Sequence, residues 1–183
     1  GHTVLDTAPT LGNLTQEEEW LNSTPEQWLA TTLTYDAYGN VKTVRDALSR
    51  TTTNDYDAAT STYLVKITNT LGHTRELTYD ARFGAVTSSK DQNGVITSTA
   101  YDALGRVTKV IGPTDTAALP TITYAYELST VPAVPAKTTV QTRVASGQPA
   151  VLTVHTFTDG LGRTIQTRAP AEDPTKQVVT GPV

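Results

Sequence analysis

The sequence predicts an all-β protein built from repeated antiparallel β-hairpins, and three observations lead to this prediction. A tyrosine-aspartate pair recurs at residues 35, 56, 79 and 101, with separations of 21, 23 and 22 residues. A second turn signal begins with Asp or Asn near the middle of each interval, at residues 46, 69 and 91. Threonine, whose branched side chain suits strands, supplies 37 of the 183 residues. Self-similarity at a fixed period is typical of repeat architectures, so we predict a curved sheet that repeats every 22 residues or so.

Residues 101–108 show how one repeat forms a hairpin. Asp102 at the first turn position can accept hydrogen bonds from the backbone N–H groups two and three residues on, and Gly105 can take a positive φ. The resulting type I turn with a left-handed glycine pairs Asp102 with Arg106 on an exposed face and Tyr101 with Val107 on a buried face. Ser49 replaces the glycine in one turn, which we expect to be strained or differently built. The same pattern predicts structural turn positions at Asp36, Gly39, Asp91, Gly94, Asp102, Gly105, Asp159 and Gly162.

Residues 1–27 are predicted to be a lead-in segment with a possible short helix over about 16–21. Thr15 and Glu18 have the spacing of a capping box, and acidic residues in the first turn suit the helix dipole. Pro25 could start a further helical turn, but we favour Trp28 as the start of the first strand of the array.

The hairpin array is predicted to cover residues 28–168. Pro-rich irregular loops are expected near 112–120 and 131–136. A strand is expected between them at 121–126, where Tyr124 lies 23 residues after Tyr101 and so keeps the period. The segment 169–183 is expected to be a loosely ordered tail.

Composition excludes several classes of protein. A net charge of −4 with scattered Lys and Arg gives no surface for nucleic acid, and no apolar run approaches the roughly 18 residues of a membrane span. No signal peptide is visible, and the absence of Cys excludes disulfides and thiolate metal sites. The sequence contains no Met, so we expect a segment of a longer protein. Unpaired strands at the ends of such an array predict edge-to-edge self-association.

No set of residues converges on a catalytic or metal-binding chemistry in the sequence. His2, His73 and His155 lie far apart, and a structural role is expected for them. The many Asp residues are explained by the turns, and the segment 91–94 lacks the further carboxylates of a calcium loop. We therefore expect no catalytic residue, no cofactor and no metal. Tyr124 and Tyr126 share one strand face and form a possible binding face, although packing is the favoured interpretation.

The repeated Tyr-Asp-x-x-Gly-Arg/Asn-Val pattern, from about residue 28 to 168, resembles the YD repeat of the Rhs (rearrangement-hotspot) proteins. The same repeat occurs in the B and C components of insecticidal Tc toxins and in the teneurins. The resemblance implies a β-sheet that spirals into a hollow shell, which encloses a cytotoxic C-terminal region in the bacterial toxins and supports cell-surface recognition in teneurins. Residues 156–163 resemble the bacterial branch more closely.

The chain departs from this family pattern in two respects. It holds too few repeats to close a shell alone. It also lacks the Asp-Pro-x-Gly signature at which the toxin branch cleaves itself, because Thr175 and Lys176 follow Asp173 and Pro174. Neither autoproteolysis nor toxic activity is therefore expected of these residues.

The resemblance and the missing catalytic set together predict a structural fragment of an Rhs shell, not an enzyme. Expected partners are the flanking repeats of the parent protein and an enclosed toxin polypeptide, with a bacterial secreted or cell-surface location. The alternative is a module that binds a glycan or a surface receptor through Tyr124 and Tyr126 or the Pro-rich loops. An enzyme would instead show a hydrolytic activity that a single His or Asp substitution abolishes.

Overall fold

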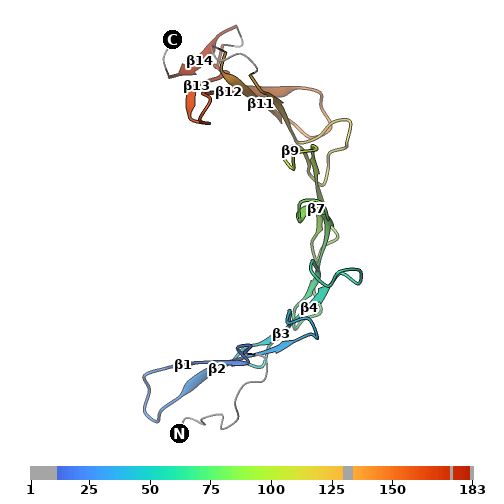
Figure 1. The fold of residues 1–183 in the computed structure, drawn as a ribbon, viewed down its shortest axis with the longest axis vertical. Coiled ribbons are helices and arrows are strands. Elements are labelled where there is room, and N and C mark those ends of the chain that lie inside the picture. Colours follow the sequence, from blue (N-terminus) through green and yellow to red (C-terminus); the bar gives the residue numbers. More distant parts are fainter. Residues whose placement is uncertain (1–11, 130–133, 174, 182–183) are drawn as a thin grey trace. The chain divides into compact units, whose positions relative to one another are not determined.

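The structure is a computed structural model, and it describes residues 12–129, 134–173 and 175–181. The chain divides into two compact units, Gly1–Leu77 and Thr78–Val183, and each is described here on its own. Every element in the described ranges is a strand, which confirms the predicted all-β class (Figure 1). The part of the chain that the structure describes accordingly contains no helix of the length and apolar character that a membrane crossing requires.

In the first unit, each strand pairs antiparallel with the strand that follows it in the chain. Trp28–Tyr35 forms a strand with the bounds that the sequence predicts. The register shifts at Tyr35 and again at Tyr56, so each of these tyrosines lies at a β-bulge. The strands are β1 (Gln16–Trp20), β2 (Trp28–Tyr35), β3 (Val41–Arg45), β4 (Thr51–Tyr56), β5 (Leu64–Thr68) and β6 (Thr74–Asp80), of which β6 ends in the second unit.

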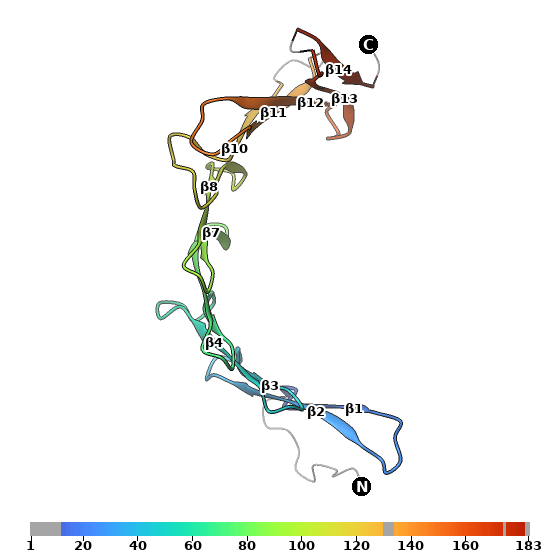
Figure 2. The same cartoon turned by 180° about the vertical axis from the view of Figure 1, so that it is seen from behind.

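The second unit continues the same hairpin pattern (Figure 2). Its longest strands, β11 and β12, pair over eight residues each. Bulges recur at Tyr101 and at Thr158. The strands are β7 (Ala85–Lys90), β8 (Ile96–Tyr101), β9 (Val107–Ile111), β10 (Ile122–Glu127), β11 (Ala136–Arg143), β12 (Val151–Thr158), β13 (Thr164–Pro170) and β14 (Gln177–Thr180).

The predicted helix over about 16–21 is wrong, because β1 occupies this segment and pairs with β2. The pairing places Trp20 opposite Trp28, and aromatic side chains favour strands over helices. A helix of one or two turns is marginal in water, whereas a strand satisfies its backbone groups against an existing neighbour. Thr15, the expected helix cap, instead accepts a hydrogen bond from the Leu33 N–H at its carbonyl.

The irregular segment 112–120 connects β9 and β10, and polar contacts attach it to the loop between β11 and β12. Asp115 accepts hydrogen bonds from the hydroxyls of Thr121 at 2.6 Å and Ser146 at 2.7 Å. These two bonds, in that order, lower the pKa of the Asp115 carboxyl. Arg143 of β11 donates to the Pro120 carbonyl at 2.9 Å, so the insertion is held against its neighbour.

The other irregular regions are only partly described. In the second predicted loop, 131–136, residues 131–133 lie outside the described ranges, and β11 begins at Ala136. The first residues of the lead-in segment, and His2 with them, also lie outside. Within 169–183, where no strand was predicted, the structure places β14, which pairs with β13. A four-residue strand is too short for a recognisable alternation in sequence.

The described residues form no buried hydrophobic core. Most strand side chains are half-buried, as expected when a sheet packs no second layer against either face. Stability therefore depends on strand pairing, on contacts between neighbouring strands and on the turns. The candidate site is built from these turns and their neighbours.

Candidate functional site

The aspartate at the start of each turn organises the backbone around it. In the turn 102–106, the Asp102 Oδ1 accepts hydrogen bonds from the N–H groups of Leu104 and Arg106, both at 2.9 Å. The Gly105 N–H donates to the Asp102 carbonyl at 3.1 Å, and Gly105 has a φ of 77°. The carboxylate thus accepts hydrogen bonds from the backbone N–H groups of the second and fourth residues after it. The sequence pattern predicted the N–H groups of the second and third residues.

The other predicted turn positions have the same geometry. Asp36, Asp91 and Asp159 each accept two backbone N–H groups at one carboxylate oxygen. The glycines that close these turns all have positive φ: Gly39, Gly94 and Gly162. Ser49 takes a φ of 65° in the corresponding place, so its turn has the same form with a side chain in a region that favours glycine.

Arginine completes three of the turns with an ion pair to the same aspartate. The Asp102 Oδ2 lies 2.7 Å from the Arg106 guanidinium, as the sequence predicts. The backbone N–H of Arg106, followed by its side chain, lowers the pKa of the Asp102 carboxyl. Backbone and side-chain bonds from Arg163 lower the pKa of Asp159 in the same way. The folded state therefore stabilises the ionised form of both carboxyl groups.

At four places a tyrosine hydroxyl donates to a backbone carbonyl of a preceding segment of the chain, and we call this set the tyrosine ladder. Tyr101 donates to the Val86 carbonyl at 2.8 Å, and Tyr126 donates to the Val107 carbonyl at 2.9 Å. Val107 is also the cross-strand partner of Tyr101 at the bulge. The ladder thus links successive hairpins within a unit. Its described members are Tyr35, Tyr56, Tyr101 and Tyr126.

The ladder places Tyr126, and not Tyr124, in the position that follows Tyr101. The Arg106 guanidinium lies 4.3 Å from the centre of the Tyr126 ring, a distance typical of a cation–π contact. Burial raises the pKa of the Tyr126 phenol above its ordinary value of 10.0. Of the two tyrosines proposed as a binding face, Tyr126 therefore has both its hydroxyl and its ring in contact with the preceding hairpin.

One turn also packs directly on the next. A Cβ built on Gly105 would lie 2.9 Å from Cδ1 of Phe83, so the Phe83 ring occupies the space beside this glycine. The Arg82 guanidinium lies 5.0 Å from the centre of the same ring. Nothing lies within 4 Å of the corresponding point at Gly162. Sequence reasoning missed this contact, although Phe83 lengthens its turn by one residue relative to the turn 102–105.

The described histidines have polar neighbours of an ordinary structural kind. His155 Nδ1 lies 3.0 Å from the Thr139 hydroxyl on the paired strand. His73 Nδ1 lies 3.5 Å from the Asn69 side-chain amide within one turn. Among the described residues, no three His, Cys, Asp or Glu side chains come together as metal ligands would.

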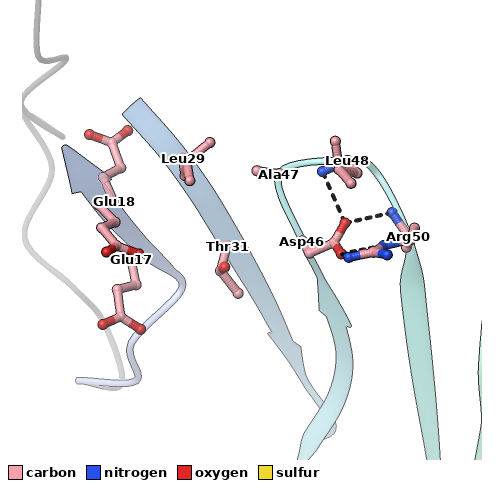
Figure 3. Close-up of a pocket in the computed structure, with 9 residues that line it drawn as sticks. Glu17, Glu18, Leu29, Thr31, Asp46, Ala47, Leu48 and Arg50 are labelled. Atoms are coloured by element: carbon pink, nitrogen blue, oxygen red, sulfur yellow. Dashed lines mark hydrogen bonds and ion pairs between the residues drawn. The ribbon is translucent and has the colours of Figure 1, made fainter. Parts of the chain in front are cut away.

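Two open hollows lie among the described residues of the first unit, and no sequence motif indicated either of them. The larger measures about 630 Å³ and lies between the β1–β2 hairpin and the turn 46–50 (Figure 3). The smaller measures about 470 Å³ and lies between the turn 46–50 and the turn that contains Leu71. The larger hollow is lined by Glu17, Glu18, Glu19, Leu29, Thr31, Asp46, Ala47, Leu48 and Arg50.

Residues 82–117 match a family model described as RHS Repeat. Among solved structures, TcdB2-TccC3 matches with a TM-score of 0.65 and 18% identity, over 85% of this chain and 10% of that chain. TcdB2-TccC3-Cdc42 matches with a TM-score of 0.65 and 15% identity, over 91% and 13%. TcdB2-TccC3 without its hypervariable C-terminal region matches with a TM-score of 0.63 and 16% identity, over 87% and 12%.

This chain spans only about a tenth of the chains in these structures, and identities this low show a shared fold alone. None of the curated proteins compared with the chain matches it. The family model falls on the part of the chain where the Phe83–Gly105 contact and the turn 102–106 lie. The resemblance drawn from the sequence is therefore confirmed, and residues 82–117 match the RHS repeat.

Proposed function

We propose that this chain is part of the wall of an Rhs-type shell that encloses a toxin polypeptide of a secreted bacterial protein. Its role is structural and not enzymatic, and its partners are the flanking repeats and the enclosed polypeptide. The observation that carries the proposal is the repeated connection of hairpin to hairpin by the tyrosine ladder in a sheet without a core. Such a sheet separates two compartments without needing a second layer.

The mechanism of a wall is steric. Strand pairing satisfies the backbone groups along the sheet, and the turn aspartates satisfy backbone N–H groups in the turns. The ladder adds a hydrogen bond at each of its four described tyrosines, which resists local separation of the hairpins. A polypeptide on one side is then inaccessible to a protease on the other.

Limited proteolysis of the parent protein that carries this segment tests the proposal. We expect the region enclosed by the shell to resist cleavage, and a Tyr101→Ala, Tyr126→Ala variant to expose it while the protein stays soluble. Tyr38→Ala is the matched control, because Tyr38 is largely exposed at a turn tip. Equal cleavage of the enclosed region in all three proteins would refute a shielding function.

The alternative, a module that binds a glycan or a receptor, is checked with a Tyr124→Ala variant. Binding of the purified chain to a glycan array, abolished by Tyr124→Ala alone, would favour that alternative. The contacts of Tyr126 support the wall instead, since its hydroxyl and ring already face the preceding hairpin.

A further inference from the structure

Large apolar side chains recur at the tips of the turns. The third residue of five turns is Leu or Tyr, and its exposed fraction runs from 68% to 80%. Single exposed apolar residues are common on proteins, but the same turn position repeated five times is a pattern. Burial of an exposed leucine side chain is favourable, so these tips favour a covering partner. The tips are Tyr38, Leu48, Leu71, Leu104 and Leu161.

The larger hollow of the first unit has the complementary chemistry. Figure 3 shows Glu17 and Glu18 on β1, beside Leu29 and Thr31 on β2 and Leu48 on the facing turn. Residues 12–41 contain no Lys or Arg, so the hairpin presents carboxylates without basic neighbours in sequence. The Arg50 guanidinium is engaged by Asp46 at 2.6 Å. The lining of the hollow thus combines carboxylates with apolar side chains.

The turn 159–163 presents the matching groups. Leu161 at its tip is 80% exposed, and the Arg163 side chain beside it is 74% exposed. Arg163 holds its ion pair to Asp159 through Nε, at 2.7 Å. A leucine and a guanidinium two residues apart fit a hollow of about 630 Å³ that has leucines and carboxylates on its sides.

We propose that this hollow seats an Asp-x-Leu-Gly-Arg turn of another YD-repeat segment, which a second copy of this chain supplies in vitro. The leucine contacts Leu29 and Leu48, and the arginine faces Glu17 and Glu19. The inference rests on the proposed wall function, because a single sheet that spirals around the enclosed polypeptide brings the turns of one part of the shell against another part of it. Opposite charges give such a contact its register, and the leucines give it affinity.

Site-specific cross-linking tests the contact, since the chain has no native Cys. One chain carries Thr31→Cys in the hollow and the other carries Gly160→Cys beside the tip, where a Cβ meets nothing within 4 Å. We expect a disulfide between the two chains after mild oxidation, identified by mass spectrometry of the linked peptides. Ala125→Cys, exposed on β10, replaces Gly160→Cys as the control and should cross-link roughly tenfold less, the factor that about 1.4 kcal/mol produces.

A charge exchange then tests the orientation. Glu19→Lys in the hollow chain should lower the yield, and Arg163→Glu in the partner chain should restore it. Glu172→Lys makes the same change in net charge on an exposed residue elsewhere and should leave the yield unchanged. Because Arg163→Glu also removes the ion pair to Asp159, far-UV circular dichroism checks that variant, and Leu161→Ser provides a second way to lower the yield.

Equal yields at the control cysteine, or no recovery on charge exchange, would overturn the inference. The two proposals fail separately. If the parent protein shields its cargo but these chains do not cross-link, the wall function stands and the proposed contact is refuted. If the chains cross-link specifically but the cargo is not shielded, the proposed contact stands and the shielding function is refuted.

Discussion

Replacing Gly105 with alanine should destabilise the second unit more than the same change at Gly162. Both glycines have a φ of 77°, where an alanine costs about 1–2 kcal/mol, offset by about 0.4–1 kcal/mol of lost freedom in the unfolded chain. Gly162→Ala should therefore cost roughly 1 kcal/mol. At Gly105 the new Cβ would lie 2.9 Å from Phe83 Cδ1, and moving that ring off its rotamer adds about 0.5–1.5 kcal/mol.

The assay is native-state hydrogen exchange, because local stability in a repeat array differs from place to place. The reporter amides are those of Asp102 and Asp159, which donate across their turns to Arg106 and Arg163. The excess cost at Gly105 should disappear when Gly105→Ala is made in a Phe83→Ala chain. Equal exchange for the two alanine variants, or an excess that survives the loss of Phe83, would refute the steric argument.

Three further outcomes follow from the turns and the ladder. Tyr101→Phe removes the hydroxyl that donates to Val86 and should lower the free energy of unfolding by about 0.5–1.5 kcal/mol in urea denaturation, while Tyr38→Phe at an exposed tip should leave it unchanged. Ser49→Gly relieves a positive φ and should raise that free energy by about 1 kcal/mol; a decrease would show that the hydrogen bond from Arg45 to the Ser49 hydroxyl outweighs the backbone term. Asp102 and Asp159 have folded-state pKa values below the ordinary 3.8, so the stabilisation they provide is complete above that pH and is lost as pH falls through the lowered values. Circular dichroism should therefore show unfolding that begins below about pH 4, and an Asp102→Asn variant should lose part of this dependence.

The sequence predicted the turns because their chemistry is local. An aspartate, a glycine four positions into the turn and an arginine suffice to specify the geometry found at residues 102–106. The bulge beside Tyr101 and the pairing with Val107 follow from the same few residues. Local rules repeated at a fixed period thus indicated the fold class correctly.

The features that sequence did not predict depend on contacts between hairpins. The capping pattern of Thr15 and Glu18 indicated a helix, but pairing with β2 determined the structure of that segment. Tyr124 kept the numerical period, yet the insertion at 112–120 displaced the ladder position to Tyr126. The hollow beside β1 combines strands and a turn that are up to about thirty residues apart, so no motif encodes it.

The absence of a buried core among the described residues affects how the stability of this chain responds to temperature. The heat capacity of unfolding depends mainly on the apolar surface that becomes exposed, and ordinary domains gain about 12–15 cal/mol/K per residue. Side chains that are only half-buried in the folded sheet gain less exposure, so the increment for this chain should fall below that range. Its stability curve is then shallow, and the chain keeps a nearly constant free energy of unfolding between cold and warm surroundings.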